Sequence, residues 1–416
     1  MMEARVRRAR AEDVEEIHSV MTSAFGVEPG SERWESWRRL AEGWRDFLVM
    51  ELGGRIVGAV RIKGERLRYG ENATIIKGDV GYVSVRRELQ GRGLGTRLMG
   101  EAVRFMREEG MHISRLGGLI KFYSRFGYVP FPRRFYEFPL DPARAGAATI
   151  PPEEYLALPS DEEARIRPYE PGRDWRKRWE LYKCFNRGLI GPIAEPSSPR
   201  PESGGPDESG LRWVYEEDGL RGYVFAHRSG DEAEIHGAFD LSHPSALPSL
   251  VRKILIELRR RDTRRVLGRL PFDHEVERRL VEGGVGFLLR EVCSYPASNM
   301  LLLIDLKRFV EAAAPEWSER MRRRIGSPPW TGKVELRVGG QAAEVEISSE
   351  GVGAVEGRSE PDVSLAFDPR DFLLMALGYR GFDEIAGSIR GHIPSRLASL
   401  LSALFRREPT AAGPLG

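Results

Sequence analysis

The stretch "LQGRGLGTRL" (residues 89–98) decides how the first part of this chain is interpreted. Glycines alternate at positions 91, 93 and 95, the strand-like "VGYVSV" precedes them, and an apolar-periodic segment follows. A strand that leads through glycines into a helix presents free backbone N–H groups at the positive end of the helix dipole. Glycines leave room for an anion, and Arg92 and Arg97 add positive charge. The stretch therefore predicts a site for a phosphate or pyrophosphate.

Three phosphate-binding patterns compete for this stretch. A P-loop requires a Lys followed by Ser or Thr, and no Lys occurs here, so we exclude it. A dinucleotide fingerprint requires G-x-G-x-x-G, but its sixth position is Thr96 and the strands upstream read as antiparallel. The third pattern, Gln-x-x-Gly-x-Gly, is present over residues 90–95. A glycine-rich helix start without a ligand is the remaining alternative.

Outward from this stretch, periodicity predicts one mixed α/β unit that ends near residue 145. The expected helices are 11–25, 31–43 with Ser31 as N-cap, 93–110 and a short one within 119–127. The expected strands are 4–10, a hairpin around Gly53-Gly54, 72–85, a short strand before 119, and the aromatic segment 128–140. The order is therefore β-α-α-β-β-β-α-β-α-β.

This order and the Gln-x-x-Gly-x-Gly pattern resemble the GNAT superfamily of acyltransferases. The resemblance implies that the turn binds acetyl-CoA as co-substrate. It also implies that the preceding strand splays from its neighbour, so that main-chain groups at Val83 and Val85 bind the acetyl carbonyl and the pantetheine arm. The cofactor-binding residues expected in this chain are Val83, Ser84, Val85, Gln90, Gly91, Arg92, Gly93, Leu94, Gly95 and Thr96.

The segment "KFYSRFGYVPF" (121–131) is similar to the family segment that follows the fifth strand. By that resemblance, Tyr123 lies beside the thioether of coenzyme A and acts as general acid. A phenol with a pKa near 10 can protonate a thiolate as it leaves. Tyr128, which follows Gly127, is expected to be a packed core ring.

The acceptor side carries weaker signals. Asp79 is the local candidate for a general base, although "KGD" also reads as a turn. A cationic amine acceptor favours an acidic pocket, so Glu28 is a candidate substrate residue. Trp34 and Trp37 are candidates to flank the acceptor, with core packing as the alternative for one of them.

Beyond residue 140 the chain divides again. Residues 141–164 read as a Pro- and Ala-rich linker, and the segment that follows repeats the opening order of strand, helix and three strands. From about residue 300 a strand, helices and an antiparallel meander predict a small α+β domain. The expected domains are a GNAT domain at 1–145, a diverged second copy at 164–298 and a third domain at 299–410.

This combination resembles the Eis (enhanced intracellular survival) family, whose third domain is like a sterol carrier protein. The resemblance implies N-acetylation of small polycationic amines or lysine side chains, homohexamers, and an active-site role for the C-terminal carboxylate, here that of Gly416. The counterpart of 89–98 falls within 240–253, where Pro244 and Pro248 replace glycines. Since proline has no N–H, the middle domain is not expected to bind acetyl-CoA.

Composition restricts the class of protein. The formal net charge is +2 over 416 residues, which argues against a dedicated nucleic-acid binder. The two cysteines, Cys184 and Cys293, form no CxxC pair, and no metal site is expected. No run is long and apolar enough for a membrane helix, and the first residues lack a signal core, so a cytoplasmic location is expected.

Two other functions compete with an acetyltransferase. The third domain could carry an apolar ligand while the GNAT units serve as scaffold, and an apolar tunnel within 300–405 would favour that role. Alternatively, the acceptor is a protein lysine or N-terminus, which a wide, shallow cleft would favour.

Overall fold

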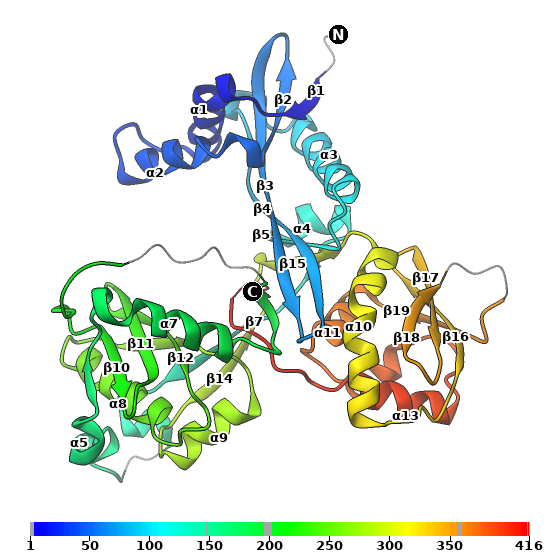
Figure 1. Cartoon of the computed structure of the whole chain (residues 1–416). Coiled ribbons are helices and arrows are strands. Elements are labelled where there is room, and N and C mark those ends of the chain that lie inside the picture. The colour runs from blue at the N-terminus through cyan, green and yellow to red at the C-terminus, as the bar shows by residue number, and fades with distance from the viewer. Residues whose placement is uncertain (1–3, 147–148, 195–201, 356–359, 414, 416) are drawn as a thin grey trace.

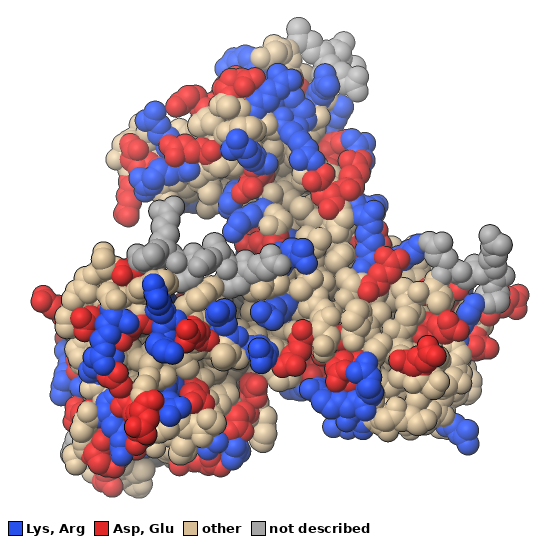
Figure 2. Space-filling model, in the orientation of Figure 1, with Lys and Arg blue, Asp and Glu red and all other residues tan. Residues whose placement is uncertain are grey.

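The computed structural model describes residues 4–146, 149–194, 202–355, 360–413 and 415. Three lobes surround a long β-hairpin that reaches down from the N-terminal lobe (Figure 1). On the face drawn in Figure 2, basic and acidic side chains are intermixed over all three lobes. The architecture is mixed α/β with tandem GNAT-like folds, as expected from the sequence.

The first lobe has a mixed sheet in the order β1-β2-β3-β4-β5-β15-β6, with β9 added beside β3. Its strands are β1 (Arg5–Arg8), β2 (Phe47–Leu52), β3 (Arg55–Tyr69), β4 (Ala73–Val85), β5 (Ile113–Leu119), β6 (Val129–Pro130), β9 (Ile190–Ile193) and β15 (Ala297–Leu303). Its helices are α1 (Val14–Phe25), α2 (Glu32–Ala41), α3 (Leu94–Glu108) and α4 (Ile120–Tyr123). Ser31 caps α2 as predicted, since its side chain accepts a hydrogen bond from Trp34 N at 3.2 Å.

The second lobe repeats this arrangement. Its sheet runs β8-β10-β11-β12-β13-β7-β14, and β12–β13 is a parallel pair, as β4–β5 is in the first sheet. Its strands are β7 (Arg133–Phe138), β8 (Ile166–Pro168), β10 (Arg212–Glu216), β11 (Leu220–Ser229), β12 (Glu232–Phe239), β13 (Arg265–Arg269) and β14 (Leu288–Val292). Its helices are α5 (Pro152–Tyr155), α6 (Ser160–Glu163), α7 (Pro171–Phe185), α8 (Ala246–Arg259) and α9 (His274–Glu282).

The two sheets exchange strands. The aromatic strand β7, expected in the first unit, pairs with β13 and β14 of the second sheet. In return β15, expected to open the third domain, pairs with β5 and β6 of the first sheet. The sequence "NMLLL" suits this place, because its side chains are buried on both faces of a central strand. The domain boundaries at 145 and 299 remain predictions, and the sheets do not follow them.

The third lobe is a small α+β unit with the sheet order β18-β17-β16-β19. Its strands are β16 (Gly332–Val338), β17 (Gln341–Ile347), β18 (Val352–Val355) and β19 (Val363–Phe367). Its helices are α10 (Leu306–Arg324), α11 (Pro369–Ala376), α12 (Phe382–Ile385) and α13 (Ser395–Leu404). Apolar side chains of the sheet and helices pack into one cluster that also takes in Tyr69 and Leu67 of β3.

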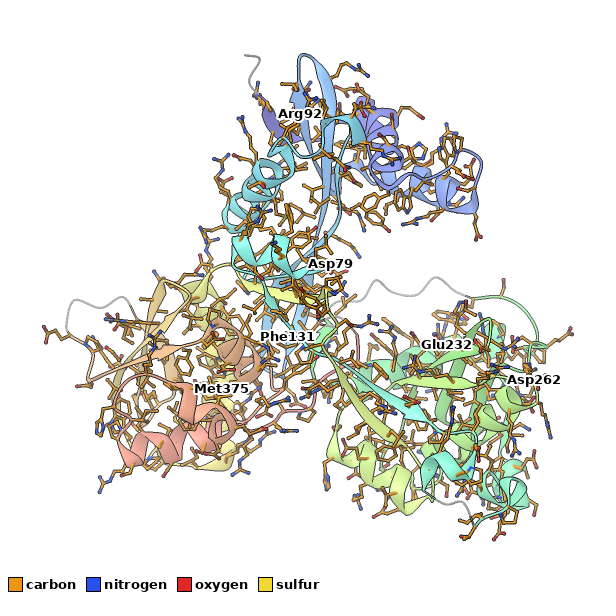
Figure 3. The ribbon with its side chains drawn as sticks, turned by 180° about the vertical axis from the view of Figure 1, so that it is seen from behind. Asp79, Arg92, Phe131, Glu232, Asp262 and Met375 are labelled. Atoms are coloured by element: carbon orange, nitrogen blue, oxygen red, sulfur yellow. The ribbon has the colours of Figure 1, made fainter. Side chains whose placement is uncertain are left out.

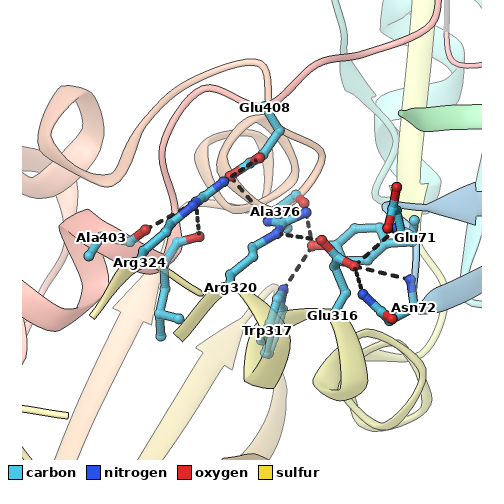
Figure 4. Close-up of polar contacts among 11 residues, drawn as sticks. Glu71, Asn72, Glu316, Trp317, Arg320, Arg324, Ala376, Ala403 and Glu408 are labelled. Carbon is cyan, nitrogen blue, oxygen red and sulfur yellow. Dashed lines mark hydrogen bonds and ion pairs between the residues drawn. The ribbon is translucent and has the colours of Figure 1, made fainter. Parts of the chain in front are cut away.

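The tip of the β3–β4 hairpin docks on the third lobe through a buried polar network (Figure 4). The Glu316 carboxylate accepts hydrogen bonds from the backbone N–H groups of Glu71 and Asn72, at 3.2 and 3.1 Å. Tyr69 Oη donates to the Ala376 carbonyl at 2.6 Å and accepts from Trp317 Nε1 at 2.9 Å. These hydrogen bonds pair polar groups of the hairpin tip with polar groups of α10. They therefore hold the hairpin that carries β4 against α10.

Candidate active site

The glycine-rich turn has the backbone that the sequence predicts. Gly91 and Gly93 adopt φ of 77° and 80°, which favour glycine, and α3 begins at Leu94. A Cβ built on either glycine would meet no atom within 4 Å, so the space above the turn is open. The first-turn N–H groups of α3 therefore face a region that a ligand can enter.

Gln90 ties this turn to the strand before it. Its Nε2 donates a hydrogen bond to the Val85 carbonyl at 3.0 Å. Arg92 is exposed in the first lobe (Figure 3), and no carboxylate of the described residues pairs with it. The turn is thus fixed at one end by a side chain and carries an unneutralised charge suited to an anion.

The strand beside the turn separates from its neighbour. The β4–β5 ladder runs from Lys77–Ile113 to Val80–Leu116 and stops there. A β-bulge opposite Val60 of β3 places Tyr82 at φ 52°, and β4 then continues alongside β3 as far as Val85. Meanwhile β5 continues alongside β15 to Leu119. The two strands therefore leave an opening between Gly81–Val85 and Gly117–Leu119.

A cleft of about 720 Å³ occupies this opening and extends to the start of α3. We name it the cofactor cleft; it is lined by Phe25, Tyr82, Val83, Val85, Leu89, Gln90, Gly91, Gly93, Leu94, Gly95, Thr96, Gly117, Gly118, Leu119, Phe122, Tyr123 and Arg125. The described lining contains no Asp or Glu, while Arg125 adds a positive charge. This volume and charge suit an elongated anionic ligand.

Of the predicted cofactor residues, all except Ser84 and Arg92 lie in this lining. Ser84 is buried, and its Oγ donates to the Tyr82 carbonyl at 2.8 Å, so its side chain stabilises the bulge. Sequence reasoning missed Phe25 and Tyr82, which line the cleft from α1 and from the bulge. No local pattern distinguishes them from core aromatics.

Tyr123 lies on the wall of the cofactor cleft. Its ring packs against the backbone of Gly118, where a Cβ would come within 2.2 Å of Tyr123 Cε2. Burial raises the pKa of the Tyr123 hydroxyl, so the phenol is neutral at physiological pH. Tyr128 is fully buried and its hydroxyl lies 2.7 Å from Ser114 Oγ, as expected of a core ring.

The candidate acceptor residues lie outside the described cleft lining. Glu28 is exposed, and Trp34 packs edge-on against His18 with ring centroids 4.4 Å apart. Trp37 is buried and packs against Phe25 and Tyr82 with centroids 5.3 and 5.2 Å apart. Trp37 thus supports two lining residues from behind.

Asp79 belongs to a polar chain that crosses the sheet near the junction of the lobes (Figure 3). Its carboxylate lies 3.3 Å from Lys77 Nζ and 3.5 Å from Arg115 Nη1. Arg115 Nε donates to Asn299 Oδ1 at 2.8 Å, and Asn299 Nδ2 donates to the Leu415 carbonyl at 2.9 Å. These polar contacts therefore anchor Leu415 to β15, beside the strands that separate. Gly416 lies outside the described residues.

The equivalent turn of the second lobe is built differently. The Asp240 carboxylate accepts hydrogen bonds from the backbone N–H of Ser242 at 3.1 Å and from its hydroxyl. Pro248 stands in the first turn of α8, where it removes a donor. A carboxylate and a proline thus stand where the first lobe offers free N–H groups.

Two further properties concern the part of the chain that the structure describes. No cluster of three or more His, Cys, Asp or Glu side chains is placed to hold a metal ion. None of its helices is both long and apolar enough to cross a lipid bilayer.

Residues 5–131 match the family model of the acetyltransferase (GNAT) domain. The residues described as lining the cofactor cleft all lie within this match to an acetyltransferase domain. No curated protein matches the chain.

Three solved structures resemble the chain over nearly its whole length. A GCN5-related N-acetyltransferase from Kribbella flavida is 18% identical, with a TM-score of 0.66 over 99% of this chain and 98% of that one. A conserved protein of unknown function from Enterococcus faecalis is 14% identical, with a TM-score of 0.67 and the same coverage. Eis1 from Mycobacterium abscessus is 15% identical, with a TM-score of 0.60 over 99% of this chain and 100% of that one. At these identities the likeness shows the shared three-lobed fold.

Proposed function

We propose that this protein is an acetyl-CoA-dependent enzyme that acetylates a primary amine on a small polycationic acceptor or a lysine side chain. The observation that supports it is one cleft that joins a glycine-rich helix start, two separating strands and a half-buried tyrosine. The Eis-like architecture supports the amine class of acceptor. We also propose a homohexamer, from the resemblance to the Eis family, and a cytoplasmic location, from the sequence.

The residues present fit coenzyme A in charge and shape. The N–H groups from Gly93 to Thr96 suit a pyrophosphate, and the open Cβ directions of Gly91 and Gly93 leave room for it. The main-chain groups of Val83 and Val85 border the opening, where they would hold the acyl arm. Bound acetyl-CoA would supply a thioester carbonyl that an amine can attack.

The chain's own groups then have distinct roles. A backbone N–H of β4 polarises the carbonyl oxygen as negative charge develops on it. Tyr123 Oη would donate its proton to the thiolate of coenzyme A that leaves as the amide forms. Burial keeps the phenol protonated for this step. Asp79 is held in ion pairs with Lys77 and Arg115, which favours a positioning role for it.

The C-terminal carboxylate of Gly416 remains our proposal for the base. Its support is the anchoring of Leu415 by Asn299, which brings the last described residue to β15. Glu28, Trp34 and Trp37 stay candidates for the acceptor side.

A carrier role has less support. We propose a sterol-carrier-like fold for the third lobe, but its apolar residues pack into one cluster. A cleft of about 410 Å³ that this lobe shares with the second lobe has a mostly charged lining, including Arg134, Glu277 and Glu408. Neither feature suits a lipid.

Calorimetric titration with acetyl-CoA tests the cofactor assignment. Gly93→Glu should abolish binding, because it puts a carboxylate at the proposed pyrophosphate site. Gly93→Ala controls for backbone strain at φ 80° and should retain most of the affinity. Gly100→Glu, on the exposed side of α3, controls for the added charge and should bind like the wild type. Absence of binding by the folded wild type would overturn the proposal.

A further inference from the structure

A second cleft, which we name the outer cleft, adjoins the cofactor cleft. It measures about 460 Å³ and is lined by Leu119, Lys121, Phe122, Arg125, Tyr295 and Pro296. Leu119, Phe122 and Arg125 line both clefts, so the two are direct neighbours. The Phe122 ring also lies 3.8 Å from the Cβ position of Gly95, so the outer cleft begins next to the helix start that suits a pyrophosphate.

The outer cleft carries positive charge without a counter-charge. Lys121 and Arg125 are exposed, no carboxylate of the described residues pairs with either, and the described lining has no Asp or Glu. The Arg125 guanidinium lies 4.8 Å from the centroid of the Phe122 ring, and its Nε donates to the Phe122 carbonyl at 3.3 Å. By contrast, Arg134 and Arg167 of the second sheet are neutralised by Glu or Asp partners. Two unneutralised cations in one cleft favour a phosphate.

The outer cleft also presents an exposed aromatic ring. Tyr295 is 87% exposed and belongs to the segment that links β14 to β15. The segment is held against β5, because Ile120 N donates to the Pro296 carbonyl at 3.0 Å and Ala297 pairs with Leu119. A solvent-facing ring on an anchored backbone segment, beside two cations, suits stacking with a nucleobase.

We infer that the outer cleft binds the nucleotide end of coenzyme A, with Lys121 and Arg125 holding its 3′-phosphate and Tyr295 stacking on its adenine. This inference rests on the proposed function. It assigns a role to the strand exchange, because the segment that returns from the second lobe supplies Tyr295 to the cofactor site of the first. The cofactor site is then built from both lobes.

Calorimetry with two ligands, coenzyme A and 3′-dephospho-coenzyme A, tests this inference. The wild type should bind coenzyme A at least about tenfold more tightly than the dephospho form. Lys121→Ala/Arg125→Ala should reduce this ratio to near one, because the double variant loses much more affinity for coenzyme A than for the dephospho form. Tyr295→Ala should weaken both ligands about fivefold or more, and leave their ratio unchanged. Arg104→Ala, an exposed position on α3, is the matched control and should preserve both affinities.

Each outcome separates the inference from the proposed function. Equal wild-type affinities for the two ligands, or an unchanged ratio in the double variant, would overturn the inference and leave the cofactor assignment intact. If Tyr295→Ala binds both ligands as the wild type does, stacking on that ring is refuted. If the folded wild type binds neither ligand, the proposed function itself fails.

Discussion

The Glu316 carboxylate occupies the space that a side chain at Gly70 would need, since a Cβ there would lie 2.2 Å from Glu316 Cδ. Gly70 is the tight point of the β3–β4 hairpin, at φ 72°, and Glu316 stands on α10 of the third lobe. The contact joins the third lobe to the strand that lines the cofactor cleft. The third lobe therefore braces the first, whatever else it binds.

Removal of this carboxylate should destabilise the protein. Glu316→Ala leaves Arg320, which is 1% exposed, without its closest ion-pair partner, and two backbone N–H groups without an acceptor. We expect a loss of about 3 kcal/mol, seen as a lower apparent Tm by calorimetry. Glu319→Ala on the same helix removes only a surface pair with Arg322 and should cost less than about 1 kcal/mol. Equal Tm values for the two variants would contradict the bracing role.

Loss of the Tyr123 hydroxyl should affect turnover rather than binding. Tyr123→Phe should lower kcat about a hundredfold and leave the Kd for acetyl-CoA unchanged, because the phenol acts only as the thiolate departs. Tyr128→Phe is the control for ring packing and should keep kcat. Because burial raises the pKa of Tyr123 above its ordinary value of 10.0, the acid form persists to high pH. The rate of the wild type should therefore show no decrease due to Tyr123 ionisation below pH 10. If Tyr123→Phe fails to bind acetyl-CoA, the role of general acid is refuted.

Two neighbouring glycines of β5 allow a matched test of how Tyr123 is positioned. Gly118→Ala forces the Tyr123 ring to move and should lower both kcat and Tm, since the added Cβ would sit 2.2 Å from Cε2. Gly117→Ala adds a Cβ that meets no atom within 4 Å, so its Tm should equal that of the wild type. Thermal scans and steady-state kinetics distinguish the two variants. A wild-type kcat in Gly118→Ala would show that ring position is unimportant.

Acid should weaken the fold through His112. Burial lowers the pKa of His112 to about 4, and its Nδ1 accepts a hydrogen bond from Ile76 N at 3.0 Å, which requires a neutral ring. The unfolded chain takes up a proton near pH 6.5 and the folded chain does not, so stability falls as pH drops from 6.5 to 4, by about 3 kcal/mol in total. His112→Asn should flatten this part of a Tm–pH curve. His227→Asn, at an exposed position, should leave the slope unchanged, and an unchanged slope in His112→Asn would refute the assignment.

Local signals predicted the backbone of the glycine turn that lines one side of the cofactor cleft. Residues 90–96 form the turn and helix start that their glycines indicate, and Gln90 closes the turn onto Val85. The aromatic part of the lining was harder to predict, because Trp37 and Phe25 are both aromatic residues of predicted helices. One is buried in the core, whereas the other lines the cleft at 48% exposure. Helical spacing of aromatic residues does not distinguish a residue buried in the core from one that lines a cleft.

The sequence by itself determined the helices of the first lobe, the glycine turn and the repeat of one unit, because caps, periodicity and backbone freedom act between near neighbours. Only the tertiary structure decided that β7 joins the second sheet and β15 the first, that Tyr295 lines the outer cleft, and that Glu316 fills the space at Gly70. A strand's alternation specifies which face it buries and not which distant strand it pairs with. Such partners are chosen by packing across the whole chain.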